Sequence, residues 1–408
     1  MCVFALTSLP KISPRPWVNG VGREGSRLGR GGKGVNGRES LLPVGRMSLP
    51  RIGPGHERAR HYVSQMSENL AAKHRHDQRA YDKEVDPNEV ATAYGRRKVE
   101  KLCQTLAHPS VPDEVKRDAI FVLDAVCSTQ ENKYQAVDEG GCASLVELQY
   151  AVTGECRAAA AKMLAYLCTE PKARASAVSA GALPALCANV GSSRTAEVRY
   201  AAAKCLSIVC SGIGEAGVGY PYECIPPVVE ALGDDSDSAS AAYSYLLQTL
   251  AALTETEDGV MECLQHRSLP AALVRAGSHP GAQLSGAQFL RNMCQVEQGR
   301  VQAFERGGLP VLARLMGSAD AEVRRMASGA MVGMTVWKPA KVAMCDPDGT
   351  VASAVNTCLH DTDFTTAENA LAIIHNCAEH PPCRDTFKAL ISTDPNVSPE
   401  SRVQLMGF

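Results

Sequence analysis

The sequence predicts an all-α fold, a linear array of about seven helical repeats that stack into a solenoid. Leu-Pro or Ile-Pro pairs recur at intervals of 42, 44 and 40 residues, and a period near 40 residues is typical of helical-repeat arrays. Aromatic residues make up only 5% of the 408-residue chain, which suits helices that pack closely through small side chains. The recurring pairs are Leu183-Pro184, Ile225-Pro226, Leu269-Pro270 and Leu309-Pro310.

The stretch 307–334 contains one complete predicted unit of two helices. A glycine pair turns the chain, and Pro310 follows at a first helical position, where a missing N–H is tolerated. Asp320 is expected to cap a second, longer helix, with Glu322 in its positively polarised first turn. Apolar residues recur at helical spacing, as Leu312, Leu315 and Met316 in the first helix and Val323, Met326, Ala327, Ala330, Met331 and Met334 in the second.

The longer helix recurs along the chain, so we expect seven units between residues 90 and 392. Gly141 and Gly349 open weaker copies of the shorter helix. The longer helices begin at Glu114-Val115-Lys116, Glu155-Cys156-Arg157, Glu197-Val198-Arg199 and Glu322-Val323-Arg324, with divergent copies at Ser238, Gly281 and Thr365. The unit resembles the armadillo repeat, whose long third helix has a Glu-Val-Arg start and a small-residue centre. The resemblance implies an armadillo/HEAT-like, right-handed helical-repeat solenoid.

Two glycines, Gly329 and Gly333, fall in the middle of the second helix of the unit 307–334. Glycine inside a helix costs about 1 kcal/mol relative to alanine. We therefore expect a close contact with an adjacent helix or a partner, which Gly329→Leu would disrupt.

Residues 1–65 form a basic leader that precedes the array. It contains eleven Lys/Arg, three acidic residues and eleven glycines, a composition that predicts disorder. The remaining residues carry 31 basic and 41 acidic side chains, a formal charge of −10. We expect a linker and entry segment over 66–89, the repeat array over 90–392 and a C-terminal tail over 393–408.

Three interpretations of the leader are open. Met66 opens a plausible natural start, so the leader can be a mis-assigned beginning of the chain. It can also be a dispensable genuine tail, or a targeting or polyanion-binding segment. No secretory signal is present in the sequence. The longest charge-free run, 175–193, is interrupted by Ser, Gly, Pro and Asn, so no membrane span is expected.

Sixteen cysteines occur without a Cys-x-x-Cys pair, and most lie at apolar helix positions. This pattern predicts buried free thiols in a reducing compartment rather than disulfides. His375, Cys377, His380 and Cys383 lie close in sequence, but Pro381-Pro382 interrupts them and the first two point to different helix faces. The sequence therefore predicts a helix end and a loop there rather than a zinc site.

Glycine-rich spacings do not indicate nucleotide binding. Two Gly-x-Gly-x-x-Gly matches lie in the leader with no strand before them. A third, Gly212-Gly214-Gly217, follows a stretch that aligns with the long helices, so we expect a helix end there. No catalytic motif stands out. We therefore expect no enzymatic activity and no cofactor or metal.

Armadillo proteins of the importin-α type bind extended basic peptides through an Asn on each long helix and a Trp four residues earlier. This chain lacks most of that ladder. The positions equivalent to the ladder Asn are occupied by Ala125, Tyr166, Ile208, Thr249, Asn292, Gly333 and Asn376. The positions equivalent to the ladder Trp are occupied by Phe121, Lys162, Lys204, Tyr245, Gln288, Gly329 and Ala372. Asn292 and Asn376 are interpreted as hydrogen-bonding residues on the helix surface. Candidate partner-binding residues are Tyr94, Tyr166, Thr249, Asn292 and Asn376.

The segment 86–102, DPNEVATAYGRRKVEKL, resembles the entry segment of the radial spoke armadillo-repeat protein family of motile cilia, of the radial spoke head protein 14 type. The matching residues are Asp86-Pro87, Ala91, Ala93-Tyr94-Gly95, Arg97 and Lys101-Leu102, followed by Lys116, Arg117, Ala119 and Lys133-Tyr134-Gln135-Ala136. Tyr94 can also pack on the first repeat as an end cap, as a solenoid requires. The leader and the glycine-rich stretch near residue 214 depart from the family pattern.

The resemblance implies a non-catalytic structural subunit of the radial spoke in the axoneme of the cilium or flagellum. Its partners would be other radial spoke subunits, and we expect no small-molecule substrate, membrane or nucleic acid. The alternative is a soluble cytoplasmic armadillo adaptor that binds client peptides in its groove. The two differ in whether the protein stays with the axoneme after detergent extraction.

Overall fold

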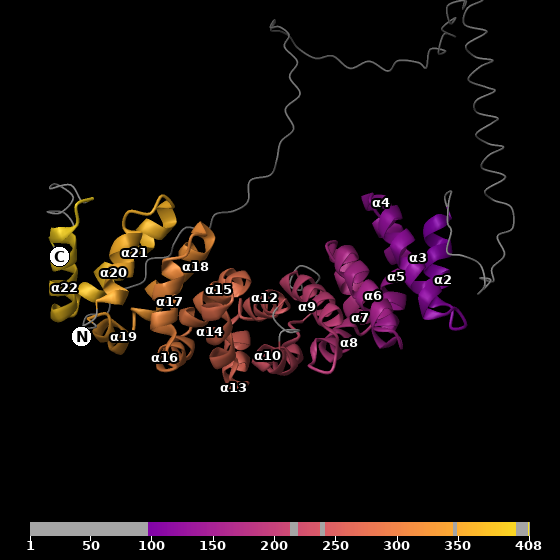
Figure 1. Cartoon of the computed structure of the whole chain (residues 1–408), viewed down its shortest axis with the longest axis horizontal. Helices are drawn as coiled ribbons and strands as arrows, with labels where there is room; N and C mark the ends of the chain where they lie inside the picture. The colour runs from indigo at the N-terminus through magenta and orange to yellow at the C-terminus, as the bar shows by residue number, and fades with distance from the viewer. Residues whose placement is uncertain (1–96, 213–218, 237–240, 346–348, 397–406, 408) are drawn as a thin grey trace, which may run out of the picture. The chain divides into compact units, whose positions relative to one another are not determined.

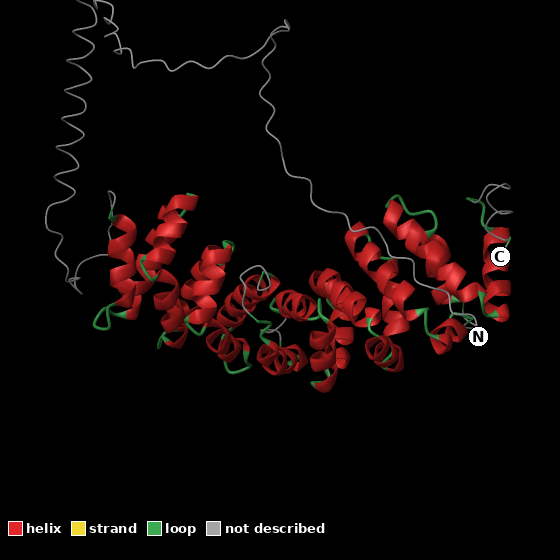
Figure 2. Cartoon of the chain, turned by 180° about the vertical axis from the view of Figure 1, so that it is seen from behind, coloured by secondary structure: helices red, strands yellow, loops and turns green. Residues whose placement is uncertain are grey.

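The computed structural model describes residues 97–212, 219–236, 241–345, 349–396 and 407. All regular elements among them are helices, which confirms the predicted all-α class (Figure 2). The chain divides into the units Met1–Glu68 and Asn69–Phe408, and every described helix lies in the second. The leader, the linker, Tyr94, Ser238 and most of the C-terminal tail lie outside the described residues.

Seven longer helices follow one another in chain order along the array (Figure 1). Each packs side by side with the next, so together they form one side of the array, here called the long-helix face. They are α3 (Asp113–Val126), α6 (Gly154–Leu167), α9 (Ala196–Ser211), α12 (Tyr243–Leu253), α15 (Gln283–Gln295), α18 (Ala321–Met334) and α21 (Phe364–Ala378).

A shorter helix precedes each long helix and packs against it as a helical hairpin. It is called the second helix from here on, because another helix precedes it in most units. Six of these helices begin at or beside the predicted Gly, Leu-Pro or Ile-Pro starts, so the predicted pairing of a shorter with a longer helix is confirmed. The second helices are α2 (Lys98–Ala107), α5 (Gly141–Glu147), α8 (Ala182–Val190), α10 (Ile225–Gly233), α14 (Ser268–Ser278), α17 (Gly308–Met316) and α20 (Thr350–Cys358).

A further short helix lies between most units, so the complete unit has three helices. The last of them among the described residues, α22, is longer, with 13 residues, and packs on both α20 and α21. These helices are α4 (Gln130–Asp138), α7 (Pro171–Ser179), α13 (Glu257–Gln265), α16 (Glu297–Glu305), α19 (Lys338–Ala343) and α22 (Pro381–Thr393), with single 3-10 turns η1 (Leu148–Tyr150), η2 (Tyr222–Cys224) and η3 (Pro280–Ala282).

The turn before the second helix adopts a left-handed backbone in five units. Glycine occupies this position four times, at Gly140, Gly181, Gly307 and Gly349. Arg267 takes it once, with a φ of 55°. A side chain in this conformation is strained, so the turn before α14 carries a local cost that the other four turns avoid.

The hydrophobic core runs through the whole array instead of gathering at one centre. Small residues let neighbouring long helices approach closely, as the mid-helix glycines show. A Cβ added at Gly333 would lie 2.9 Å from the carbonyl oxygen of Cys294 on α15. A Cβ at Gly329 would lie 3.4 Å from the side chain of Arg291. The expected close contact is therefore present at Gly333, whereas Gly329 faces the flexible end of a side chain.

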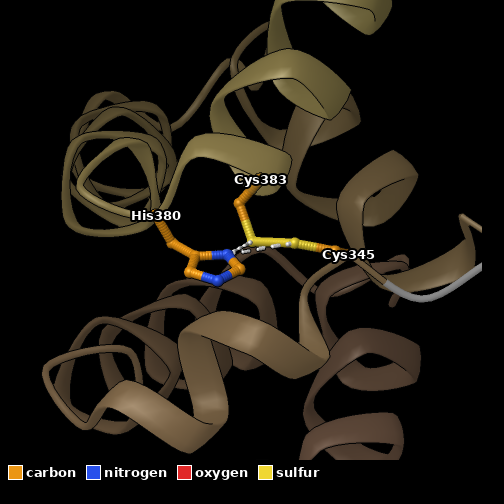
Figure 3. Close-up of side chains that lie close together, drawn as sticks. All are labelled: Cys345, His380 and Cys383. Carbon is orange, nitrogen blue, oxygen red and sulfur yellow. Dashed lines mark hydrogen bonds between the residues drawn. A yellow bond between two sulfur atoms is a disulfide. The ribbon is translucent and has the colours of Figure 1, made fainter.

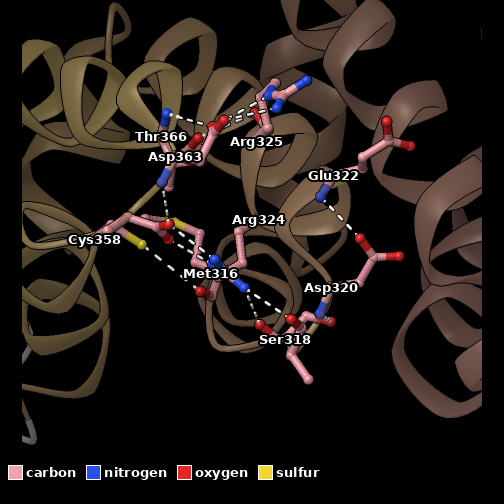
Figure 4. A network of polar contacts seen from close by, with 12 residues as sticks. Met316, Ser318, Asp320, Glu322, Arg324, Arg325, Cys358, Asp363 and Thr366 are labelled. Carbon is pink, nitrogen blue, oxygen red and sulfur yellow. Dashed lines mark hydrogen bonds and ion pairs between the residues drawn. The ribbon is translucent and has the colours of Figure 1, made fainter.

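Arginine residues at the start of α18 connect this unit to the next (Figure 4). Nη2 of Arg324 donates to Oδ1 of Asp361 at 2.8 Å, and Nη2 of Arg325 donates to Oδ1 of Asp363 at 2.6 Å. These hydrogen bonds hold the pKa of both carboxyl groups below the ordinary range. Asp320 accepts from the backbone N–H of Glu322, which confirms the predicted helix cap.

The same inter-unit contact occurs at Arg199, the Arg of another predicted Glu-Val-Arg start. Its side chain is fully buried. Nη1 donates to Oδ2 of Asp234 at 2.7 Å, and Nε donates to the carbonyl oxygen of Val190 at 3.2 Å. The Arg of the Glu-Val-Arg start therefore joins its own unit to the following one.

The cysteine prediction holds for most residues and is wrong for one pair. Thirteen described cysteines are free, and all of these except Cys187 are buried. Cys345 and Cys383 instead form a disulfide. They lie 38 residues apart in sequence, about one repeat, so stacking places them together. Short spacings such as Cys-x-x-Cys do not indicate a pair this far apart in sequence. None of the described helices is long and apolar enough to cross a membrane.

Candidate partner-binding site on the long-helix face

A hollow of about 360 Å³ opens on the long-helix face where α3, α6 and α9 meet. It is here called the N-terminal hollow. Because three successive units contribute to it, the stacking of the repeats creates it. Its lining residues are Arg117, Ile120, Phe121, Asp124, Glu155, Ala159, Lys162, Met163 and Glu197.

Phe121 is the most prominent apolar side chain of the hollow. It is 63% exposed, although most large apolar residues of the described array are buried. It belongs to α3 and occupies the position that corresponds to Trp in the importin-α ladder. A free aromatic ring beside the small Ala159 provides a surface for an apolar or aromatic side chain of a partner.

Two ion pairs between adjacent helices border Phe121. Arg117 of α3 pairs with Glu155 of α6, and Nζ of Lys162 of α6 lies 2.7 Å from Oε1 of Glu197 of α9. Hydrogen bonding to Glu155 raises the pKa of Arg117. Glu155, Lys162 and Glu197 are exposed and Arg117 is partly exposed. Each pair is therefore weak and can exchange its partner for a charged ligand group.

Further along the same face, two tyrosines meet between α9 and α12. The ring centroids of Tyr200 and Tyr245 lie 5.4 Å apart in an edge-to-face arrangement, and their hydroxyl oxygens are 3.4 Å apart. The hydrogen bond with Tyr200 raises the pKa of Tyr245 to about 12. Tyr245 also occupies a Trp-equivalent position. Aromatic residues therefore occupy this position in two units, although neither is Trp.

Three of the candidate partner-binding residues use their polar atoms to contact the preceding unit. The hydroxyl of Tyr166 donates to the carbonyl oxygen of Cys127 at 3.1 Å. Nδ2 of Asn292 donates to the carbonyl oxygen of Ala251 at 2.9 Å, and Nδ2 of Asn376 donates to that of Val332 at 3.4 Å. Each acceptor lies at the C-terminal end of a long helix, where carbonyl groups lack helical partners.

The other two candidates differ from this pattern. Thr249 is fully buried, and its hydroxyl donates to the carbonyl oxygen of Tyr245 within α12. Tyr94 lies outside the described residues. Partner binding by the five residues stays a prediction. The sequence places Phe121 at a Trp-equivalent position of the ladder but did not identify it as a site residue, because the hollow forms only where α3, α6 and α9 meet.

Of the four His and Cys residues that lie close in sequence between residues 375 and 383, the structure brings only two together. His380 and Cys383 lie beside Cys345, and their ligand atoms lie within 4.8 Å of one another. His375 and Cys377 are not members of this group. The predicted helix end is present after Ala378, but the predicted loop is wrong, because α22 begins at Pro381. The sequence did not indicate the group because Cys345 comes from the preceding unit.

The remaining sequence features are the glycine-rich stretch near residue 214 and the free cysteines. A long helix, α9, leads up to Gly212, as predicted, whereas Gly214 and Gly217 lie outside the described residues. Burial raises the pKa of the free thiols, for example to about 12 at Cys103 and Cys263. A buried thiol with a raised pKa is a poor nucleophile.

Comparisons with known proteins establish the fold alone. No protein family and no curated protein matches the sequence. An engineered protein of the Northeast Structural Genomics Consortium aligns with a TM-score of 0.62 and 21% identity, over 78% of this chain and 81% of that protein. A designed armadillo repeat protein aligns with a TM-score of 0.50 and 17% identity, over 58% of this chain and 99% of that protein. The array is therefore armadillo-like.

Proposed function

We propose that this chain is a non-catalytic armadillo-like scaffold whose long-helix face binds a segment of a partner protein at the N-terminal hollow. The exposed ring of Phe121, bordered by exchangeable ion pairs, carries the proposal. An apolar anchor within a charged rim is the usual organisation of a protein interface. The expected partner segment presents an apolar side chain flanked by charged groups.

The proposed assembly is the radial spoke of motile cilia, with other spoke subunits as partners. This finer proposal rests on the resemblance of residues 86–102 to the radial spoke armadillo-repeat family. A linear array also suits such a role, since it provides extended contact area without requiring a catalytic site. The absence of an importin-type Asn/Trp ladder in the sequence favours this role over binding of basic peptides.

Fractionation of ciliated cells tests the assembly. After detergent has removed the membrane and matrix, the tagged protein should remain with the axoneme and leave it only in salt that strips spokes. A null mutant should beat abnormally. Complete release with the soluble matrix, together with normal beating of the null mutant, would favour the alternative of a soluble adaptor that binds client peptides.

A pair of variants tests the hollow itself. Phe121→Ala should weaken retention on the axoneme at least tenfold, because removing a central aromatic side chain of an interface costs about 2 kcal/mol or more of binding free energy. Val152→Ala is the matched control, since Val152 is 91% exposed and lies outside the hollow. Equal retention of both variants would remove the hollow from the interface while leaving the spoke assignment untouched.

A further inference from the structure

A compact group of two cysteines and one histidine joins the last two short helices of the array (Figure 3). Cys345 follows α19, His380 caps the start of α22, and Cys383 lies in the first turn of α22. The sulfur atoms are bonded to each other at 2.07 Å. Nδ1 of His380 lies 3.5 Å from Sγ of Cys383 and 3.8 Å from Sγ of Cys345.

The position of the imidazole is the feature that a disulfide alone does not explain. In a tetrahedral zinc site, Zn–S distances of about 2.3 Å and Zn–N distances of about 2.0 Å place nitrogen about 3.5 Å from each sulfur and the sulfurs about 3.8 Å apart. Both observed nitrogen–sulfur distances lie near that value. Only the two sulfurs would have to separate.

We propose that the reduced Cys345–Cys383 pair and Nδ1 of His380 form a binding site for one Zn²⁺ ion, whose fourth position is open to water or to a ligand from a partner. Two thiolates and one imidazole are a soft donor set that suits zinc. The site would hold α22, the last described helix, against α19. It would therefore fix the end of the array through a metal instead of a covalent bond.

The two states of the pair exclude each other. Reduction of the disulfide takes two electrons and two protons from a dithiol reductant, which becomes a disulfide, and leaves two thiols on this chain. Zn²⁺ then replaces both thiol protons, which pass to solvent. Sγ of Cys383 lies 2.8 Å from the carbonyl oxygen of Lys341, so the metal-free thiol can donate a hydrogen bond there. Metal binding must displace this contact.

The test uses the full chain, reduced with a phosphine and transferred without oxygen into metal-free buffer. Co²⁺ is added as the probe, followed by Zn²⁺. We expect one Co²⁺ per chain with the visible absorption of tetrahedral coordination and a sulfur-to-cobalt charge-transfer band, both abolished by one equivalent of Zn²⁺. Cys345→Ser and Cys383→Ser should each weaken Co²⁺ binding at least a hundredfold, because each removes one of the two thiolate ligands.

His380→Asn distinguishes coordination from folding. Asparagine is a favourable residue at the N-cap position that His380 occupies, so the helix should be retained while affinity for Co²⁺ falls at least tenfold. Cys187→Ser is the control, because Cys187 is the one free described cysteine that is not buried and it lies outside the group. This variant should bind Co²⁺ as the wild type does.

A further arm needs no substitution. Oxidising the wild-type pair, with the Cys345–Cys383 linkage confirmed by peptide mass mapping, should abolish Co²⁺ binding, and reduction should restore it. The proposal is overturned if the reduced chain binds no Co²⁺, if binding survives oxidation of this pair, or if Cys187→Ser removes it as fully as Cys383→Ser does.

Discussion

Replacing Gly333 by alanine introduces one methyl group between α18 and α15. That methyl carbon would lie 2.9 Å from the carbonyl oxygen of Cys294, 3.1 Å from its Cβ and 3.2 Å from its carbonyl carbon. The first contact is with backbone, so it can be relieved only if the two helices move apart. Overpacking of this kind costs about 1–3 kcal/mol, and the gain in helix propensity offsets about 1 kcal/mol of it. We expect Gly333→Ala to destabilise the protein by about 1 kcal/mol.

Gly329→Ala is the matched control, one turn earlier on the same helix. Its new methyl carbon would lie 3.4 Å from Nε and 3.5 Å from Cδ of Arg291, and 3.7 Å from Nδ2 of Asn369. These are flexible side-chain ends that can adjust. The helix-propensity gain of about 1 kcal/mol should therefore be retained. Gly329→Ala is expected to stabilise the protein and Gly333→Ala to destabilise it.

The assay combines thermal melting with amide hydrogen exchange. An array of repeats can unfold in parts, so the melting midpoint alone does not locate the change. Faster exchange in α15 and α18 of Gly333→Ala, with the rest of the array unchanged, would match the expected local effect. The packing argument is refuted if the two alanine variants shift stability in the same direction by similar amounts.

Three further predictions follow from backbone strain, ion pairing and inter-unit hydrogen bonds. Arg267→Gly should raise the stability measured by denaturant unfolding by about 1 kcal/mol, because it relieves a left-handed backbone, whereas Arg267→Ala should give no such gain. Asp363→Asn keeps the hydrogen-bond acceptor that caps α21 but removes the charge paired with Arg325. Because the pKa of Asp363 is lowered in the folded state, its stabilising contribution is present above the unfolded pKa of about 4 and is lost as the pH falls below it. The wild type should therefore be more stable than Asp363→Asn at pH 7, and melting midpoints should converge in acid; a constant gap would contradict the pairing argument. Asn292→Ala should cost about 1 kcal/mol through loss of the hydrogen bond to Ala251, measured by denaturant unfolding, and no loss would show that this contact contributes nothing to stability.

The repeat units were predictable from sequence because their boundaries are encoded locally. Pro184 and Pro310 lie near the starts of second helices, and glycines supply the left-handed turn before them. The short helices between the units, such as α4, were not predicted because segments such as Gln130–Asp138 are polar and only nine residues long. Their N-cap residues, Thr129 and Thr256, accept hydrogen bonds from the first turn and were a usable signal.

The candidate sites were less predictable because they depend on stacking. Phe121 could be aligned with the Trp position of the importin-α ladder, but its exposure results from the way α3, α6 and α9 meet. Cys345 approaches His380 and Cys383 only because residues about one repeat apart occupy neighbouring positions. The sequence cluster around residue 380 supplied two of the three ligands without indicating the third.

Photo-crosslinking in isolated axonemes tests the proposed function most directly. A benzophenone amino acid replaces Phe121 in one strain and Val152 in another, so that a reactive group lies inside the N-terminal hollow or on an exposed site outside it. On illumination, the position 121 variant should form one discrete covalent adduct with a spoke subunit, and the position 152 variant should not. Adducts at position 152 alone, or none at position 121 in a protein that is retained on the axoneme, would contradict binding at the long-helix face.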